Sequence, residues 1–352
     1  MTPLAELLAD RIARTGPITM ADYMADCLMH PQHGYYSTRD PLGRAGDFIT
    51  APEISQMFGE LLGLALAQAW LDQGAPGRIA LAELGPGRGT LMADVLRATA
   101  KVPGFHDAAE VHFVETSPVL RAAQTQAVPG AVFHDHVDDL PDAPLFLIAN
   151  EFFDALPIRQ FVRDGAGWRE RMVGLDQDRL CIGLSAAAPL TLLAHRLADT
   201  QDGDLVEHCP ALPGIVQTIG QRISDHGGTA LVVDYGDWQS LGDTLQAVKD
   251  HEPTDPMDAP GEADLTAHVD FAALAAAAAP ARHTRLTSQG VFLERLGIAQ
   301  RAQALAQGLS GAALENHLAA YRRLTHGAEM GDLFKVIGLY PATAPAPPGL
   351  EP

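Results

Sequence analysis

The chain has few cysteines and no long apolar run, and each absence excludes a class of protein. Its 352 residues include 3 cysteines, Cys27, Cys181 and Cys209, which are widely spaced and form no Cys-x-x-Cys pair. Neither a disulfide framework nor a zinc knuckle is therefore indicated. No segment approaches the about 20 consecutive apolar residues of a membrane-spanning helix, so we expect no membrane insertion. Residues 1–15 also lack the unbroken apolar segment of a signal peptide, and we expect a cytoplasmic protein.

Basic residues are scarce as well. The chain has 24 Lys and Arg against 44 Asp and Glu, which gives a formal net charge of −20. Proteins that bind phosphate backbones carry clustered Lys and Arg, so we expect no nucleic acid as a partner. The same negative field would attract a basic protein segment, although a charge balance also serves solubility.

The most informative segment is an acid followed by three alternating glycines, Glu83-Leu84-Gly85-Pro86-Gly87-Arg88-Gly89. It stands between the apolar run 79–84 and the amphipathic run 91–96, a pattern that predicts a strand, a tight turn and a helix. The turn lacks the Gly-Lys-Ser/Thr ending of a phosphate-binding P-loop. A dinucleotide fingerprint would have its third glycine where this chain has Thr90.

The carboxylate of Glu83 favours one nucleotide-like ligand over the others. A buried acid would repel a pyrophosphate, whereas it would attract the ammonium and sulfonium charges of S-adenosylmethionine. Alternating glycines let the backbone approach a ligand, and the helix start behind them offers unpaired N–H groups. We therefore predict that this cofactor binds at the turn, with contacts from Glu83, Gly85, Pro86, Gly87 and Gly89.

Polar residues also end the next apolar runs along the chain. Glu115 follows the run 111–114, Asp135 follows 131–134, and Asn150 follows 145–149. In open α/β sheets, ligands bind beyond the carboxyl ends of the strands, and an acid after the second strand accepts hydrogen bonds from ribose hydroxyls. We predict this ribose contact for Glu115 and a place in the same crevice for Asp135 and Asn150. A simple strand cap is the competing interpretation for Asp135.

The remaining pattern divides the chain into four parts. We expect an N-terminal helical lid with an active-site loop at 1–75 and a core at 76–238, interrupted by an antiparallel insertion at about 159–205. A helical addition with a closing strand follows at 239–340, and the Pro- and Ala-rich residues 341–352 predict a flexible tail. The loop at 33–53 is longer than the about 12 to 15 residues of an ordinary connection, which favours a functional role.

Several longer phrases resemble those of the MidA-like methyltransferases, which are relatives of the mitochondrial complex I assembly-factor arginine methyltransferase. The phrases are GDFITAPEISQMFGE at 46–60, ELGPGRGTL at 83–91, NEFFDALP at 150–157, DLTAHVDF at 264–271 and EMGDLFKV at 329–336. The resemblance covers roughly residues 17–338, nearly the whole chain. One departure is Ala51, which stands where the family leads us to expect a serine.

The resemblance implies an α/β fold: a Rossmann-like class I methyltransferase sheet with N-terminal helices, an antiparallel insertion and a C-terminal helical addition. It also implies S-adenosylmethionine as the methyl donor and a protein arginine on a subunit of respiratory complex I as the acceptor. The donor follows more securely than the acceptor, because one fold serves many substrates.

Methyl transfer from a sulfonium is an in-line displacement, so the protein must mainly align the acceptor and exclude water. A guanidinium is always protonated, and a carboxylate can fix it in a bidentate pair. Glu151, directly after the fourth strand, is our candidate for this role, with Asp154 as the second acid and Asn150 as an oxygen acceptor. The resemblance further suggests that Asp47, in the long loop, faces the same cleft. The histidine spacings match no zinc arrangement, so we expect no metal.

Other functions stay open at this stage. The same sheet can methylate a small molecule or a side chain other than arginine. Alternatively, the protein holds a subunit during assembly without catalysis, with the cofactor as a structural ligand. A nicotinamide oxidoreductase would instead bind a dinucleotide. The sequence also leaves the oligomeric state open, with a homodimer as one option.

Overall fold

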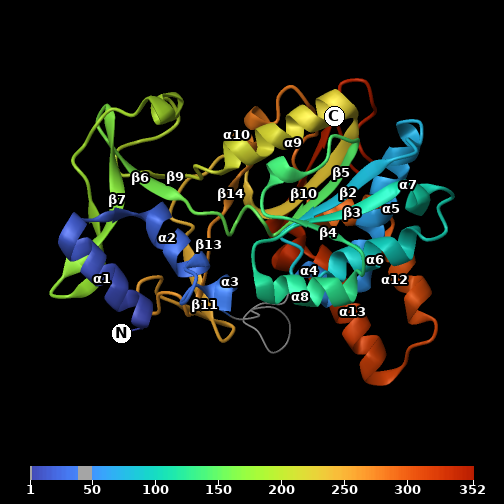
Figure 1. The fold of residues 1–352 in the computed structure, drawn as a ribbon, viewed down its shortest axis with the longest axis horizontal. Coiled ribbons are helices and arrows are strands. Elements are labelled where there is room, and N and C mark those ends of the chain that lie inside the picture. Colours follow the sequence, from blue (N-terminus) through green and yellow to red (C-terminus); the bar gives the residue numbers. More distant parts are fainter. Residues whose placement is uncertain (1, 39–49) are drawn as a thin grey trace.

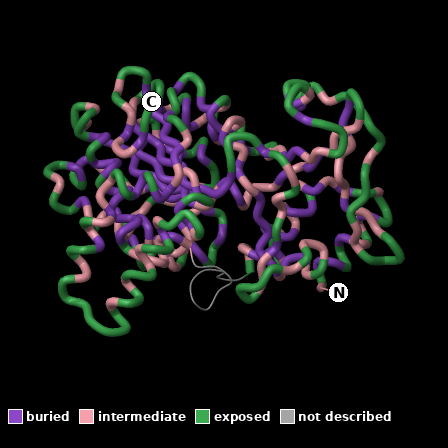
Figure 2. Tube along the Cα trace, turned by 180° about the vertical axis from the view of Figure 1, so that it is seen from behind, coloured by how far each residue is buried: buried purple, intermediate pink, exposed green. Residues whose placement is uncertain are grey.

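The structure, a computed structural model, describes residues 2–38 and 50–352. Figure 1 shows an α/β core around a central sheet and, beside it, a lobe of antiparallel strands and N-terminal helices. Buried residues are densest along the strands of the central sheet (Figure 2). Helices of the lobe and strand ends of the core together line the cavity that holds the candidate site.

The central sheet has the strand order β15-β17-β10-β5-β2-β3-β4, with β14 beside β10 and β16 beside β17. The neighbours β4, β3, β2, β5 and β10 run parallel, and β17 is antiparallel to β10. The strands are β2 (Ile79–Leu84), β3 (Ala109–Val114), β4 (Val132–His134), β5 (Leu145–Asn150), β10 (Gly228–Asp237), β14 (Val269–Asp270), β15 (Arg282–His283), β16 (Thr287–Ser288) and β17 (Phe334–Tyr340). The order reverses between β2 and β5, and ligands bind at such a switch point.

Helices cover both faces of this sheet, because buried side chains alternate along its strands. In β5, Phe146 and Ile148 belong to one apolar cluster, whereas Leu145 and Leu147 belong to the other. The first cluster includes α5 (Gln56–Asp72), α6 (Thr90–Thr99), α7 (Phe105–Ala108), α11 (Gln289–Arg295), α12 (Ile298–Ala306) and α13 (Gly311–Thr325), and the second α9 (Leu212–His226) and α10 (Phe271–Ala277). None of the helices in the described ranges has both the length and the apolar character needed to cross a membrane.

The lobe contains an antiparallel sheet of order β1-β7-β6-β9, in which β8 also pairs with β7. Its strands are β1 (Ile18–Thr19), β6 (Arg159–Asp164), β7 (Gly167–Asp176), β8 (Arg179–Leu184) and β9 (Leu205–His208). The helices α1 (Pro3–Thr15) and α2 (Met20–Met29) share an apolar cluster with β7 and with a small sheet of β11 (Gln246–Lys249), β12 (Glu252–Thr254) and β13 (Asp264–Thr266). The predicted fold class, with N-terminal helices, antiparallel insertion and C-terminal helices, is confirmed.

Local sequence signals explain the break between the two N-terminal helices. Gly16 ends α1 at a φ of 87°, and Pro17 follows, which cannot continue a helix. Thr19 then begins α2 with a capping box: its side chain accepts from the N–H of Asp22, whose carboxylate accepts from the N–H of Thr19. The turn between the helices directs the C-terminal end of α2 to the cavity.

The four-part division of the chain stays a prediction, and two of its details differ from the structure. The helix α5, which the sequence assigns to the lid, is buried along most of its length and packs with α6 on the central sheet. Residues 341–352 are packed rather than free: Leu350 is buried, and the N–H of Arg285 donates to the carbonyl of Glu351 at 2.8 Å. The composition of this segment predicted flexibility, but the apolar side chain of Leu350 packs into the core.

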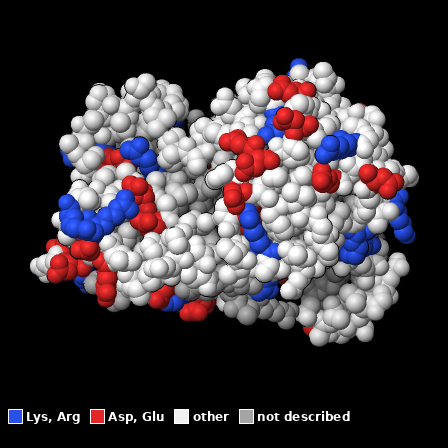
Figure 3. Space-filling view, viewed as in Figure 1, with Lys and Arg blue, Asp and Glu red and all other residues white. Residues whose placement is uncertain are grey.

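Charged side chains of both signs are interspersed on the face shown in Figure 3. Ion pairs of the protein include Arg222 with Asp142 at 3.0 Å and Arg121 with Asp135 at 2.7 Å. On the face shown, the acidic side chains are not gathered in a single patch.

Candidate functional site

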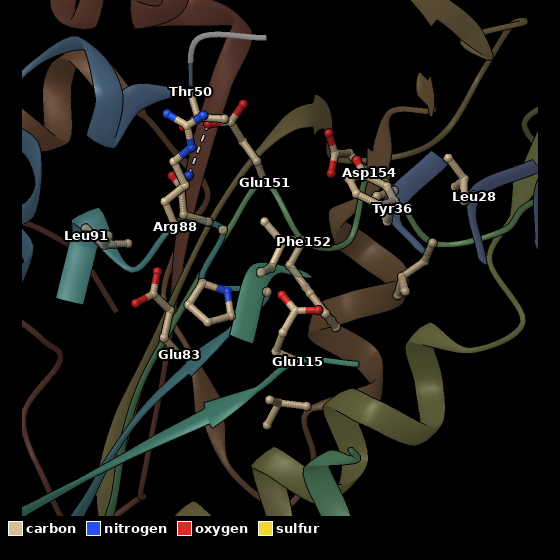
Figure 4. A pocket seen from close by; sticks show the side chains of 18 of the residues that line it. Leu28, Tyr36, Thr50, Glu83, Arg88, Leu91, Glu115, Glu151, Phe152 and Asp154 are labelled. Atoms are coloured by element: carbon tan, nitrogen blue, oxygen red, sulfur yellow. Dashed lines mark hydrogen bonds between the residues drawn. The ribbon is translucent and has the colours of Figure 1, made fainter. Parts of the chain in front are cut away.

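A cavity of about 350 Å³ lies at the carboxyl ends of the parallel strands (Figure 4). Its walls come from the turns after β2, β3, β4 and β5, from β10 and β13, and from α2, α3 (Tyr35–Thr38) and α4 (Ala51–Ile54). The sequence-predicted residues that line it are Glu83, Gly85, Pro86, Gly87, Glu115, Asp135, Asn150, Glu151 and Asp154. The strand ends therefore converge in space, whereas the contacts of each residue with a ligand stay predictions.

The turn after β2 has a backbone that favours glycine at alternate positions. Gly85, Gly87 and Gly89 have φ values of 57°, 55° and 82°, in the left-handed region that other residues avoid. A Cβ at Gly85 would lie 3.0 Å from Cδ2 of Phe152. Gly89 itself does not line the cavity; it precedes α6 and, as a glycine, provides no side-chain cap. In the first turn of α6, the N–H of Met92 donates to the carboxyl of Glu83.

Glu83 is a buried acid at the end of β2. Its side chain is 3% exposed, and burial raises its pKa to about 8, against a smaller lowering by the N–H of Met92. Its Oε2 has no hydrogen-bond partner within the described ranges. A buried acceptor without a partner is rare in folded proteins, and a bound ligand is one explanation for it.

Glu115, after β3, is held in a fixed position by its neighbours. Its Oε1 accepts from the N–H of Ser117 at 2.7 Å, and its Oε2 accepts from Nε2 of Gln124 at 3.1 Å. Gln124 also donates to the carbonyl of Gly87 at 2.7 Å, so it connects this acid to the glycine turn. Burial raises the pKa of Glu115, although the hydrogen bonds from Ser117 and Gln124 oppose that rise.

Asp135, after β4, lies at the rim. Its side chain is 66% exposed and pairs with Arg121 at 2.7 Å. The Arg121 guanidinium also donates to the carbonyls of Glu115 and His134. This arrangement is compatible both with the predicted cofactor contact and with the competing strand-end cap.

Asn150 and Glu151 occupy the turn after β5. Glu151 has a φ of 51°, and its N–H donates to the carbonyl of Val233 on β10. Its Oε1 accepts from Nδ2 of Asn150 at 3.0 Å and from the N–H of Ala51 at 3.3 Å. Burial and the nearby Asp154 carboxyl raise its pKa to about 7. Both residues line the cavity, and Figure 4 shows Glu151 among the side chains that surround it.

Asp154 is the second acid of this turn. It is 5% exposed, and burial raises its pKa to about 6, although a hydrogen bond from the Tyr235 hydroxyl opposes that rise. Its Oδ1 is buried and has no partner in the described part of the chain. In Figure 4, Phe152 lies between Glu151 and Asp154 on one side and Glu83 and Glu115 on the other.

Tyr36 and Tyr235 also line the cavity. Tyr36 belongs to the loop at 33–53, for which the sequence predicted a functional role, but the sequence singled out neither tyrosine as a site residue. The hydroxyl of Tyr36 lies 2.9 Å and 3.0 Å from the two oxygens of Asp264, and its carbonyl accepts from Oγ of Ser117 at 2.8 Å. Asp264 and Thr266, from the segment 264–271 that carries part of the family resemblance, line the cavity as well. The tandem tyrosines at 35–36 were the available signal.

Two further acids, Asp47 and Glu53, belong to the long N-terminal loop. Asp47 lies outside the described residues, so its predicted place in the cleft stays a prediction. Glu53, in the first turn of α4, lines the cavity and accepts from the hydroxyl of Thr90 at 2.6 Å. This bond joins the N-terminal segment to the start of α6.

The cavity fits S-adenosylmethionine in its chemistry. Oε2 of Glu83, Oδ1 of Asn150 and Oδ1 of Asp154 are buried acceptors without a partner among the described residues. They match a ligand that carries positive charge and N–H groups. The glycine turn lets a nucleotide approach the backbone, and Glu115 can bond to ribose hydroxyls.

Comparison with known proteins agrees with this chemistry. Residues 61–290 match the model of a family described as "Putative S-adenosyl-L-methionine-dependent methyltransferase". The chain is 36% identical over 362 residues to the protein arginine methyltransferase NDUFAF7, mitochondrial, of Xenopus laevis, covering 94% of this chain and 83% of that protein. It is 35% identical over 375 residues to the protein of the same name from Homo sapiens, covering 97% and 84%.

A solved structure is similar over nearly the whole chain. It is a Burkholderia thailandensis protein bound to S-adenosyl-homocysteine, with a TM-score of 0.83 and 30% sequence identity. The similarity covers 98% of this chain and 94% of that one. The antiparallel lobe and the central sheet therefore occur together in both proteins.

The same relatives correct one expectation from the sequence. A cytoplasmic location was expected from the absence of an apolar leader, but the similar proteins of Xenopus laevis, Drosophila melanogaster and Homo sapiens are named mitochondrial. The cytoplasmic prediction is wrong, because an apolar leader marks secretion and carries no information about import into mitochondria.

Proposed function

We propose, since this chain belongs to the family of S-adenosylmethionine-dependent methyltransferases, that it methylates the guanidinium group of an arginine in a protein. The observation that carries the proposal is the pair Glu151 and Asp154, two buried or half-buried carboxyl groups in one turn at the cavity. A guanidinium presents a fork of N–H donors, which two such carboxyls can hold in a fixed plane.

The cofactor side of the cavity follows from the residues after β2 and β3. We assign Glu83 to the cationic part of the cofactor and Glu115 to its ribose hydroxyls, with Asp135 at the rim. Gly85, Pro86, Gly87 and Gly89 form the backbone cradle. When bound, S-adenosylmethionine supplies an electrophilic methyl group on its sulfonium.

The acids after β5 have two tasks in this proposal. Glu151 orients the guanidinium and Asp154 stabilises its charge, while Asn150 accepts a hydrogen bond through its free Oδ1. The attacking nitrogen loses one proton in the transfer, and Glu151, with a pKa of about 7, can accept it near neutral pH. Phe152 lies between this region and the glycine turn (Figure 4), and we assign its ring to shielding the acceptor from water.

The protein that carries the arginine is the finer part of the proposal. We propose a subunit of respiratory complex I, on the strength of the resemblance to the complex I assembly-factor methyltransferases. The names of the similar proteins support protein arginine as the acceptor, and the net charge of −20 suits a basic peptide segment.

The test is transfer of a radiolabelled methyl group from S-adenosylmethionine into protein of a source-cell extract. Acid hydrolysis of the labelled band should release methylarginine, and its absence would refute arginine as the acceptor. Identification of the band by mass spectrometry tests the complex I assignment. Glu151→Gln should lower the transfer rate by about 100-fold, because the acceptor loses its base and ion pair.

The matched control is Glu315→Gln, an exposed acid of α13. It should leave transfer unchanged. S-adenosylhomocysteine should bind to both variants within about twofold of the wild type, since its predicted contacts lie after β2 and β3. Equal transfer by both variants would remove Glu151 from the mechanism.

A further inference from the structure

Asp234, on β10, is a buried carboxyl group to which the proposed reaction assigns no role. Its side chain is 0% exposed. Its Oδ2 accepts from the N–H of Phe153 at 3.0 Å and from the N–H of Asp154 at 3.3 Å, while its Oδ1 accepts from the N–H of Tyr235 at 3.0 Å. The side chain of Asp234 therefore connects the turn after β5 to the neighbouring strand β10 through hydrogen bonds.

The three N–H donors favour the ionised form of Asp234. An ionised carboxylate only accepts hydrogen bonds, and two or three backbone N–H groups stabilise it strongly. Lys335 is the register partner of Asp234 on β17, but its ammonium donates to the carbonyl of Asp332.

Three carboxyl groups meet here, and they cannot ionise independently. Burial, followed by the Asp154 and Glu151 carboxyls, raises the pKa of Asp234, and the pKa values of Glu151 and Asp154 lie at about 7 and about 6. Such groups titrate as a unit. The N–H donors to Asp234 oppose the rise in its pKa but do not cancel it, so the three acids share at least one proton. Oδ1 of Asp154 is buried and has no other partner among the described residues.

Other charged or titratable groups surround this cluster. They are Tyr36 of α3, Arg88 of the turn after β2, Tyr235 of β10, Asp264 of β13 and Arg323 of α13. Burial raises the pKa values of both tyrosines well above their ordinary range, so they stay neutral. Arg323 opposes the rise in the pKa of Glu151 but does not cancel it.

We propose that Asp234 is a positioning residue of the acceptor site: it fixes the turn that carries Glu151 and Asp154, and it shares with those two acids a proton that leaves when a cationic group enters. The inference rests on the proposed function. It adds that binding of the cation is coupled to release of a proton into solvent. Asp234 itself acts through the turn and does not touch the acceptor.

Two cofactor analogues test this without knowledge of the acceptor. Sinefungin carries an amine where S-adenosylmethionine carries its methyl group, whereas S-adenosylhomocysteine has no group there. Titration calorimetry of the full chain at pH 6.5, in buffers of different ionisation enthalpy, counts the protons released by each ligand. We expect sinefungin to release more protons than S-adenosylhomocysteine, by a difference of up to about one proton.

Asp234→Asn removes the charge with little change in shape. Its preference for sinefungin over S-adenosylhomocysteine should fall about tenfold, which corresponds to one pKa unit, and the excess proton release should disappear. The methyl-transfer kcat should fall while the affinity for S-adenosylhomocysteine is kept. The matched control is Glu207→Gln: Glu207 of β9 is 4% exposed, accepts from the N–H of Thr244 and from Gln160, and does not line the cavity.

Both variants lose a buried carboxylate, so both should lower the melting temperature. Only Asp234→Asn should change the ligand preference and the proton count. A folded Asp234→Asn protein with wild-type preference and proton release would overturn the proposal. If this variant does not fold, the wild type decides, and equal proton release by the two ligands overturns the proposal. Transfer to a residue other than arginine would refute the proposed acceptor, while leaving these ligand results unaffected.

Discussion

The two sides of the cavity, which face each other across Phe152, are built from different parts of the chain. The glycine side consists of residues 83–89 and Glu115, where a single turn supplies most of the wall through its backbone. The acid side consists of Glu151, Asp154, Tyr36 and Asp264. They come from the turn after β5, from α3 and from β13, and they meet through side chains. The comparison teaches that a backbone cradle depends on local conformation, whereas a side-chain cluster depends on the packing of distant segments.

The largest expected effect concerns the backbone of the glycine side. Gly85→Val places a branched residue at a φ of 57°, with its Cβ 3.0 Å from Cδ2 of Phe152. Left-handed strain and the close approach together should weaken S-adenosylhomocysteine binding by about 100-fold in calorimetry.

Gly77→Val is the matched control, because Gly77 is exposed and a Cβ there would meet no atom within 4 Å. Its affinity should equal that of the wild type. Unchanged binding by Gly85→Val would show that the cofactor does not use this turn, and the contrast between the two sides would be lost.

A smaller effect concerns the charge of Glu83. Its pKa of about 8 means that the carboxyl is protonated below pH 8 and ionised above it. Only the ionised form attracts the ammonium group of S-adenosylhomocysteine, so the affinity should rise with pH, by about tenfold in all between pH 6.5 and pH 8.5.

Glu83→Gln should flatten this rise and hold the affinity near the low-pH value of the wild type. The measurement is the dissociation constant at several pH values for both proteins. A variant with the same rise would place the titrating group elsewhere in the cavity.

The smallest effect concerns a single bond of the acid side. Tyr36→Phe removes the hydroxyl that bonds to Asp264 but keeps the backbone carbonyl that accepts from Ser117. Loss of one hydrogen bond of about 1 kcal/mol should raise the KM for the acceptor about fivefold, with unchanged affinity for S-adenosylhomocysteine.

Tyr321→Phe is its control, since the hydroxyl of Tyr321 on α13 bonds to Glu294 on α11, and neither residue lines the cavity. If Tyr36→Phe weakens S-adenosylhomocysteine binding instead of acceptor binding, the division of the cavity into two sides is wrong.

The difference between the glycine side and the acid side also explains which site residues the sequence could predict. The residues of the glycine side are contiguous, so spacing alone predicted a strand, a turn and a helix, and the structure has them at 79–99. Glu115 and Asn150 were predicted from the positions where apolar runs end, because parallel strands bring their carboxyl ends to one edge.

The acid side was harder to predict because its contacts are not local. Asp264 bonds to Tyr36 across 228 positions of sequence, and Asp234 bonds to Phe153 across 81. No period or spacing marks such pairs. Asp234 lies inside an apolar strand. Nothing in the sequence indicated that its carboxyl accepts hydrogen bonds from three backbone N–H groups. The family resemblance pointed to the segment 264–271, but only the fold shows which wall it forms.

The left-handed backbone of Glu151 sets function against stability in this molecule. A residue other than glycine at a φ of 51° costs about 1 to 2 kcal/mol. Selection for thermal resistance alone would favour glycine or asparagine at this position. The glutamate persists only as long as the two flanking strands, β5 and β10, hold the turn in place, so tolerance of this residue is a property of the sheet. Random mutagenesis scored by stability would thus tend to replace the glutamate to which we assign the acceptor.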